Sequence, residues 1–278
     1  MSLFKKGKNM NESNDQLIVE WTEMKFWIRN FIFNRGFNKA ILGLSGGFDS
    51  GFLAYTSSQE DCLGKDNVIA VSMPCNSSAD SIEDAKNLSE RLKIQCLFDD
   101  ITESVQARVN NINSIRRNTS CEVLESIDMT PLEIGNVKAR MRMITLYGYA
   151  PFFNALVMNT SNHSEFMVGN GTKYGDMAGD FAPILNYTKT RLYKMAKAVG
   201  FDKISPEIFN KIPSADLEPN QTDEGTMGVS YIQLDSFLDG VCINENGESI
   251  NTPETENRIL DLMHGTIHKR QPMPNFYL

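Results

Sequence analysis

Apolar residues follow two alternating patterns along the chain: helical spacings of three and four residues, and short continuous runs. Helical spacing over 17–31 predicts a first helix, which Gly36 can end. Continuous apolar runs predict four short buried strands, at 40–44, 68–73, 94–98 and 155–159. Helical patterns between these strands predict helices at 49–55, 80–92, 104–115 and 136–149. The second of these helices opens with Asp80-Ser-Ile-Glu83, which resembles a capping box.

Strands that alternate with helices of this length favour parallel β-α-β units. The sequence therefore predicts an α/β fold, with a doubly wound, mostly parallel sheet and helices on both faces. In such sheets a ligand binds beyond the carboxyl ends of the strands. Residues 45–50, 73–76 and 160–165 all follow predicted strands. We expect these three segments to converge on one cleft.

The second half of the chain is less regular. Residues 169–183 hold four glycines and no clear period, so we expect a functional loop there. Another loop is predicted at 206–221, and the polar stretch 116–134 predicts an irregular, partly mobile segment. Helical patterns return at 188–199, 231–238 and 253–264. We expect a disordered tail at 1–13 and a single domain over 14–278.

Length and composition narrow the class of protein. At 278 residues the chain can bury the core of one sizeable α/β domain. A net charge of −8 argues against general nucleic-acid binding, which favours a basic surface. Five cysteines without a Cys-x-x-Cys pair indicate reduced thiols in a cytoplasmic protein. No apolar run approaches the roughly 18 residues of a membrane span, and no secretory signal is evident, so we expect no membrane partner.

The strongest candidate for chemistry follows the first predicted strand. Ser45-Gly-Gly-Phe-Asp-Ser50 joins that strand to a helix. A glycine turn at a helix start presents backbone N–H groups at the positive end of the helix dipole, which suits a phosphate. The Asp49 carboxylate would lie near that phosphate if Mg²⁺ sits between them. The spacing lacks the lysine of a Walker A loop, and an ordinary tight turn is the alternative.

This loop matches Ser-Gly-Gly-x-Asp-Ser, the pyrophosphate loop of the N-type ATP pyrophosphatases. Four more motifs stand in the order seen in NAD synthetases: Gly135-Asn-Val-Lys-Ala-Arg-Met-Arg-Met143, Thr172-Lys-Tyr-Gly-Asp176, Pro213-Ser-Ala-Asp-Leu217 and His268-Lys-Arg270. The chain thus resembles the ammonia-dependent form of this family over residues 14–272. The resemblance implies a flavodoxin-like, adenine nucleotide α-hydrolase-like sheet and a homodimer. It also implies ATP-dependent amidation of deamido-NAD (nicotinate adenine dinucleotide) through an acyl-adenylate, which gives NAD, AMP and pyrophosphate.

The resemblance further implies a set of ATP contacts. Asp49 and Glu165, which follow separate strands, would share Mg²⁺ between ATP oxygens, and Lys189 would contact the phosphates. The whole implied ATP set is Gly43, Ser45, Gly46, Gly47, Asp49, Ser50, Met73, Arg142, Thr160, Lys189 and Ser214. From the residues alone, Glu165 could equally be a surface carboxylate and Lys189 a solvated lysine.

A second set is implied for deamido-NAD: Asn136, Arg140, Lys173, Asp176, Asp180, His268 and Lys269. Asp176 and Asp180 would hold the nicotinate end, and Asp176 would take the proton that ammonium must lose before attack. His268 and Lys269 would close over the phosphates as a C-terminal arm. The implied catalytic residues are Asp49, Lys189, Asp176, His268 and Lys269. Arg140 or Arg142 could instead form a structural ion pair.

One departure from the family bears on the substrate. NAD synthetases usually carry aromatic residues just before Thr-Lys-Tyr-Gly-Asp, where this chain has Asn170-Gly171. A ring that could pack near the nicotinate is therefore missing. Two alternatives stay open: amidation of a different carboxylate by the same ATP half, or a nucleotide-binding regulatory module without catalysis. The joint presence of Asp49, Glu165, Lys189 and His268 argues against the regulatory module.

Overall fold

The computed structural model describes residues 13–119, 128–214, 222–244 and 246–272. Four sequence predictions therefore lie wholly or partly outside the described residues. They concern the tail at 1–13, the middle of the 116–134 segment, the end of the loop at 206–221, and residues 215–217 of the Pro-Ser-Ala-Asp-Leu motif.

Four parallel strands form one sheet in the order β3-β2-β1-β4. Their bounds are Lys39–Gly43 for β1, Val68–Ser72 for β2, Gln95–Phe98 for β3 and Ala155–Val157 for β4. Ile41 of β1 pairs with Ile69 of β2 on one side and with Val157 of β4 on the other. The chain therefore leaves β1 in one direction and later returns to its opposite side. The carboxyl ends of β1 and β4 lie at this switch point, where ligands of doubly wound sheets bind.

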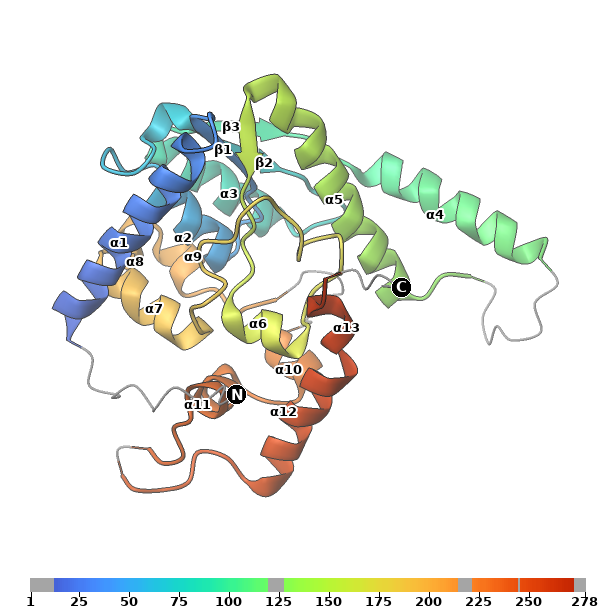
Figure 1. Cartoon of the computed structure of the whole chain (residues 1–278). Coiled ribbons are helices and arrows are strands. Elements are labelled where there is room, and N and C mark those ends of the chain that lie inside the picture. The colour runs from blue at the N-terminus through green and yellow to red at the C-terminus, as the bar shows by residue number, and fades with distance from the viewer. Residues whose placement is uncertain (1–12, 120–127, 215–221, 245, 273–278) are drawn as a thin grey trace, which may run out of the picture.

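Helices cover both faces of the sheet, and each face has its own hydrophobic core (Figure 1). One face carries α1 (Asn14–Phe33), α2 (Phe48–Ser57), α3 (Ala79–Leu92) and α7 (Lys189–Ala198). The other carries α4 (Thr102–Arg117) and α5 (Pro131–Phe153). Because side chains alternate along a strand, Leu42 packs into the first core and Ile41 into the second. The predicted α/β class is confirmed.

Two helix starts differ from the prediction. α3 begins at Ala79, and Ser78 accepts the N-cap hydrogen bond from the Ser81 backbone at 3.3 Å. The predicted capping box at Asp80 is therefore wrong, because a serine two residues earlier supplies the cap. α5 is longer at both ends than the predicted 136–149. Thr130 and Glu133 form a reciprocal capping box there, so the last part of the stretch predicted to be irregular is helical.

The remaining helices are short or belong to the C-terminal part. Their bounds are His163–Val168 (α6), Phe201–Ile204 (α8), Pro206–Phe209 (α9), Asp223–Met227 (α10), Tyr231–Asp239 (α11), Pro253–Gly265 (α12) and Ile267–Arg270 (α13), with a 3₁₀ turn at Lys65–Asn67. Helices α6, α10, α11 and α12 share a small core of their own. Among the described residues, no helix combines the length and apolarity needed to cross a membrane.

Candidate active site

The phosphate loop, residues 45–50, turns tightly from β1 into α2. Ser45 Oγ accepts a hydrogen bond from the Gly47 backbone at 3.2 Å and lies 3.1 Å from Ser50 Oγ. Ser50 Oγ in turn donates to the Gly47 carbonyl oxygen at 3.2 Å. Among the described residues, no side chain caps α2 at Gly47. The positive end of a ten-residue helix is thus left for an anion, as the sequence predicts.

Gly46 shows why the loop needs glycine. Its φ of +74° is a left-handed conformation that favours glycine. A Cβ atom at this position would also collide with the Ser81 carbonyl oxygen in the first turn of α3. The loop therefore packs backbone against backbone on α3, which fixes its place relative to the sheet.

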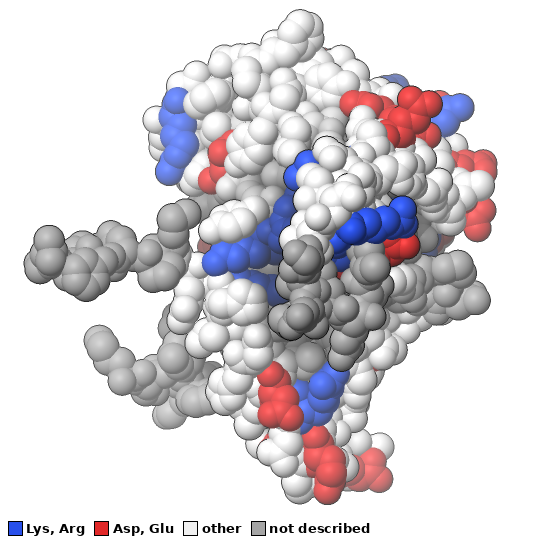
Figure 2. Space-filling model, turned by 90° about the vertical axis from the view of Figure 1, so that its right-hand side faces the viewer, with Lys and Arg blue, Asp and Glu red and all other residues white. Residues whose placement is uncertain are grey.

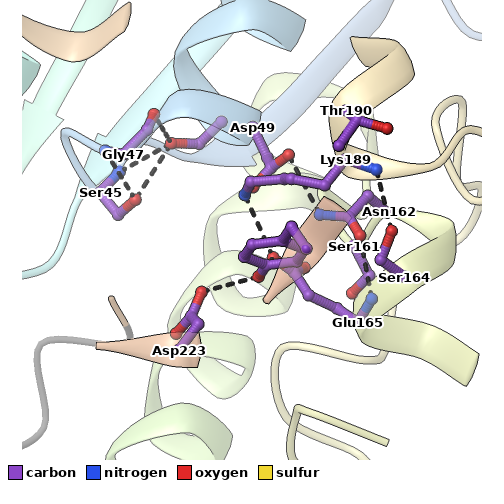
Figure 3. Close-up of polar contacts among 12 residues, drawn as sticks. Ser45, Gly47, Asp49, Ser161, Asn162, Ser164, Glu165, Lys189, Thr190 and Asp223 are labelled. Atoms are coloured by element: carbon purple, nitrogen blue, oxygen red, sulfur yellow. Dashed lines mark hydrogen bonds and ion pairs between the residues drawn. The ribbon is translucent and has the colours of Figure 1, made fainter. Parts of the chain in front are cut away.

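A buried lysine joins two carboxylates beside this loop. The Lys189 ammonium, 4% exposed, forms ion pairs with Asp49 Oδ2 and, at 3.3 Å, with Glu165 Oε1 (Figure 3). Asp49 comes from the start of α2, Glu165 from α6 after β4, and Lys189 from the start of α7. The three predicted residues thus meet at one point. Glu165 lies on a helix, not in the loop expected after the fourth strand, because Asn162 caps α6 by accepting from the Glu165 backbone at 3.0 Å.

Burial and charge act in opposite directions on this group. Burial alone would lower the pKa of Lys189, but the negative charges of Asp49 and Glu165 outweigh it and raise that pKa. Burial raises the pKa of Glu165, and the nearby Lys189 charge offsets only part of the rise. Lys189 therefore stays charged and at least one carboxylate faces it. Lys189 is therefore not the solvated surface lysine that the sequence alone also allowed.

A second layer of side chains, which sequence reasoning missed, holds Lys189 in place. The Lys189 backbone donates to Ser164 Oγ at 2.9 Å, and Ser164 Oγ donates to the buried Asp235 carboxylate. The other Asp235 oxygen accepts from the Thr190 backbone at 2.7 Å. Asp235 thus caps the start of α7 from a separate helix. Only its position on the apolar face of 231–238 hinted at burial, and nothing in the sequence named its partner.

Tyr231 is a further missed residue at the site. Its hydroxyl lies 2.9 Å from Asp223 Oδ2 and 3.3 Å from Glu165 Oε1. A single hydroxyl proton serves one acceptor at a time, and the shorter distance favours Asp223. Burial and the surrounding carboxylates raise the pKa of Tyr231, so the phenol stays protonated and can donate. Tyr231 therefore links Asp223 to the Glu165 oxygen that also faces Lys189.

The acceptor loop, residues 169–176, brings the second predicted set together. Thr172 Oγ1 donates to Asn136 Oδ1 of α5 at 2.7 Å, and the Thr172 backbone donates to Asp176 Oδ1, also at 2.7 Å. Arg140 Nε donates to the Lys173 carbonyl oxygen at 3.2 Å. The four predicted residues of α5 and this loop are thus neighbours, linked mainly through backbone groups of the loop.

The predicted C-terminal arm lies against the same loop. Lys269 Nζ, on α13, donates to the carbonyl oxygens of Gly169 and Gly171, each at 2.8 Å. Lys173 Nζ donates back to the His268 carbonyl oxygen at 2.6 Å. The His268 side chain is exposed. His268 and Lys269 thus contact the acceptor loop, and their predicted contact with substrate stays a prediction.

Asp176 lies at the centre of this region and keeps part of its surface in solvent. The protein around its carboxyl group removes water from it and so raises its pKa above the usual value, although the hydrogen bond from Thr172 and the charges of Arg142 and Lys269 oppose the rise. Basic side chains gather in the middle of the face that carries α5 and α13 (Figure 2). Arg140 and Arg270 lie close enough to Lys269 to add to the lowering of its pKa that burial begins. A strongly anionic ligand suits such a surface.

Gly171 marks the place where aromatic residues were expected. A Cβ atom there would lie 2.8 Å from Met177 Cγ and 3.1 Å from Asp176 Oδ2. The Gly171 backbone therefore packs directly against the side chains of Asp176 and Met177, and a larger residue fits only if these side chains move. This close packing does not support the alternative that glycine at 171 serves only to make the loop more mobile.

The other predicted residues lie outside the Lys189 cluster and the acceptor loop. Arg142 Nε donates to the Met73 carbonyl oxygen at 3.2 Å, which puts it at the end of β2, and Met73 also packs near Gly43. Asp180 accepts from the Val157 backbone at 2.7 Å and from Tyr147 Oη at 3.1 Å. Its carboxylate is thus used by the edge of β4 and by α5. Thr160 follows β4, and the exposed Ser214 ends the described part of its motif; their ATP contacts remain predictions.

The arrangement provides the parts for chemistry on a phosphoanhydride. A helix start and a buried ammonium can stabilise phosphate charge. Asp49 and Glu165 supply the hard oxygen donors that Mg²⁺ prefers and already converge on one cation. The described residues contain no cluster of three or more His, Cys, Asp or Glu suited to a metal. Two carboxylates fit an ion that takes its remaining ligands from nucleotide oxygens and water.

Comparison with known proteins places this geometry in a family. The sequence model of NAD synthase matches residues 20–273. An NH(3)-dependent NAD(+) synthetase of Methanocaldococcus jannaschii is 36% identical over 269 residues, which are 95% of this chain and 97% of that protein. The chain belongs to the NAD synthase family, and the resemblance seen in its motifs is confirmed.

Solved structures agree with this assignment. The structure of an NMN synthetase from Francisella tularensis superposes with a TM-score of 0.78 at 28% identity, over 96% of this chain and 100% of that one. An NH3-dependent NAD synthetase from Campylobacter jejuni gives a TM-score of 0.72 at 26% identity, over 96% and 100% of the two chains. The fold thus extends over nearly the full length of both.

Proposed function

We propose that the chain is a ligase that forms a C–N bond: it amidates deamido-NAD with ammonia and ATP, giving NAD, AMP and pyrophosphate. The observation that carries the proposal is the buried Lys189 ammonium between Asp49 and Glu165, beside a glycine loop at the switch point of the sheet. A regulatory binder has no need of two metal-suited carboxylates held by a dedicated second layer. The 36% identity to an NH(3)-dependent NAD(+) synthetase supports the same reaction.

The first step joins two anions. An oxygen of the nicotinate carboxylate attacks the α-phosphorus of ATP, the bond from that phosphorus to the bridging oxygen breaks, and pyrophosphate leaves. The N–H groups at the start of α2 bind phosphate oxygens, and Lys189 neutralises charge that builds up in the transition state. Arg142, held at the end of β2 by Met73, is placed to add a second cation. The product is an acyl-adenylate.

The second step replaces AMP with nitrogen. Ammonia, formed when ammonium loses one proton, attacks the acyl carbon. The carbon–oxygen bond to AMP breaks with its electron pair, and the nitrogen releases a second proton to solvent. Asp176 is the proposed base that removes the proton from ammonium, because burial raises the pKa of its carboxyl and so makes the carboxylate more basic. The acceptor loop and the C-terminal arm hold the rest of deamido-NAD.

Mg²⁺ is the proposed cofactor, held by Asp49 and Glu165. When bound it would neutralise phosphate charge and make the α-phosphorus easier to attack. The fit rests on the convergence of the two carboxylates on one cation. Lys189 contacts both of them and therefore sets their orientation.

A second candidate function is amidation of nicotinate mononucleotide. The Francisella tularensis protein with a TM-score of 0.78 is named an NMN synthetase, and this chain has Asn170-Gly171 where a ring was expected. Both substrates present the same nicotinate carboxylate. They differ in the adenylate half, which only deamido-NAD offers.

We also propose a cytoplasmic homodimer. α5 carries four exposed large apolar side chains, Leu132, Ile144, Tyr147 and Phe152, on a helix that also contributes to the acceptor end of the site. A second copy would cover them. Light scattering on the chain and on Ile144→Asp tests the dimer. The cysteines among the described residues, Cys62, Cys75, Cys96 and Cys242, are free thiols, which suits a reducing compartment.

The deciding experiment gives the purified chain Mg-ATP with ammonium or glutamine, and with deamido-NAD or nicotinate mononucleotide. We expect NAD and AMP in equal amounts from deamido-NAD and ammonium. A higher kcat/KM for nicotinate mononucleotide would establish the second candidate instead. ATP binding without either product would remove both acceptors, and a screen of other carboxylates would follow.

A further inference from the structure

Lys211 stands at the back of the phosphate loop and belongs to none of the motifs considered above. It follows α9, and its ammonium is within hydrogen-bond distance of three acceptors: the Gly46 carbonyl oxygen at 3.3 Å, Ser81 Oγ at 3.1 Å and Asp84 Oδ2 at 2.7 Å. The side chains of Lys211 and Asp84 are 29% and 15% exposed. We propose that Lys211 is a positioning residue that holds the phosphate loop in its ATP-binding conformation.

The acceptor count separates positioning from direct phosphate contact. A lysine ammonium has three N–H donors and no acceptor. Lys211 has a protein acceptor for each of them, so a phosphate would have to displace one. Asp84 supplies the negative charge that neutralises Lys211 in place. Lys189 differs, because both of its partners are carboxylates that suit a metal ion.

The bond to Gly46 fixes one peptide plane. The Gly46 carbonyl oxygen accepts from Lys211, while the N–H of the same peptide, on Gly47, donates to Ser45 Oγ at 3.2 Å. This peptide leads into Gly47, the N-cap of α2, and the N–H groups of the first turn of α2 would face the nucleotide. A rotation of this peptide would change the direction of those groups. Lys211 therefore acts on ATP through the loop.

Lys211 also links the loop to two other elements. Ser81 and Asp84 belong to α3, against which Gly46 already packs without room for a Cβ atom. Ser214, implied as an ATP contact, is only three residues further along the chain. One ammonium thus ties the phosphate loop, the start of α3 and the base of the Ser214 segment into one unit.

The test compares Lys211→Met with Asp84→Ala. Only the turnover measurement described below rests on the proposed function. Binding of a non-hydrolysable ATP analogue with Mg²⁺ is measured by calorimetry, which needs no acyl acceptor. We expect Lys211→Met to weaken binding about ten-fold and Asp84→Ala to weaken it about three-fold, since each loses a charged hydrogen bond behind the loop. Lys211→Arg, which can donate to the same acceptors, should recover most of the loss.

Direct contact predicts a different result. If Lys211 bound phosphate itself, Asp84→Ala would free its charge and leave the affinity unchanged or tighter, and that outcome would overturn the proposal. So would a Lys211→Met affinity within two-fold of the parent chain. Lys203→Met, an exposed lysine on α8, is the matched control. If Lys211→Met does not fold, Asp84→Ala and Lys211→Arg still decide between the two roles.

Turnover adds a second readout. With deamido-NAD as acceptor, the KM for ATP should rise in Lys211→Met while the KM for deamido-NAD stays within two-fold. A general loss of structure would raise both. If the parent chain bound the analogue but formed no NAD, the proposed acceptor would be wrong and the calorimetric result on Lys211 would still stand.

Discussion

The two halves of the site are built in different ways. The phosphate site rests on largely buried side chains that follow the neighbouring strands β1 and β4, with the Lys189 side chain only 4% exposed between its carboxylates. The acceptor loop is held mainly through backbone groups, by Thr172, Arg140 and two lysines that bind carbonyl oxygens. Backbone-held loops tolerate side-chain change more readily than a buried ion pair does. The ATP half should therefore be fixed, and the acceptor half is where substrate choice can vary.

Lys189→Met should have the largest effect, because it removes the cation from the fixed half. We expect kcat/KM to fall by about 10³-fold, the order seen when a preorganised transition-state donor is lost. Two carboxylates would then face each other with reduced charge compensation, so the free energy of unfolding should also fall. Steady-state kinetics and urea unfolding measure both. Lys194→Met, an exposed lysine on the same helix, should leave both unchanged.

Asp176→Asn tests the acceptor half by chemistry alone. We expect kcat to fall about 10²-fold from loss of the general base, while the KM for ATP stays within two-fold. With hydroxylamine as nitrogen donor, which needs no ammonium deprotonation, the fall in kcat caused by Asp176→Asn should be smaller. Activity near that of the parent chain with ammonium would reject Asp176 as the base.

Asp235→Asn should have a smaller effect, because this residue acts on Lys189 only through Ser164 and the start of α7. We expect kcat/KM to fall about ten-fold, in line with loss of one charged hydrogen bond that orients a catalytic group. The KM for deamido-NAD should not change. Ser164→Ala should produce the same pattern, and a rise in the KM of both substrates in either variant would point to a general structural defect.

The smallest effect concerns pH and stability. Burial raises the pKa of Asp176 above its value in the unfolded chain, so this group favours the folded state most at low pH and costs stability as pH rises through the folded pKa. Asn has no such titration. The unfolding free energy of Asp176→Asn should therefore increase relative to the parent chain between pH 4 and pH 7, measured in urea. A constant difference would mean that the carboxyl is not desolvated.

Local motifs predicted the fixed half well. The loop at 45–50, the two carboxylates and Lys189 follow strands or open helices, so chain order and the rule for parallel sheets were enough to bring them together. The supporting layer could not be predicted in this way. Asp235 and Tyr231 reach the site from α11, and Lys211 reaches it from the segment after α9. Their partners depend on packing between elements far apart in sequence.

Element boundaries show the same limit on a smaller scale. Three of the four strands fall within their predicted ranges and β1 begins one residue early, at Lys39, because buried parallel strands leave continuous apolar runs. α6 was not predicted, since six residues are too few for a period, and Asn162 marks its start only through a hydrogen bond. The start of α5 was missed because the polar residues 116–134 hid the capping box of Thr130 and Glu133.

The tight packing of Gly171 sets a condition for any redesign of the acceptor loop. A ring built at this position would first meet Met177 and Asp176, so it fits only if these side chains move or Met177 is replaced by a smaller residue. A smaller residue at 177 alone would leave a hollow beside Gly171. An aromatic residue at 171 therefore has to be engineered together with its neighbour at 177.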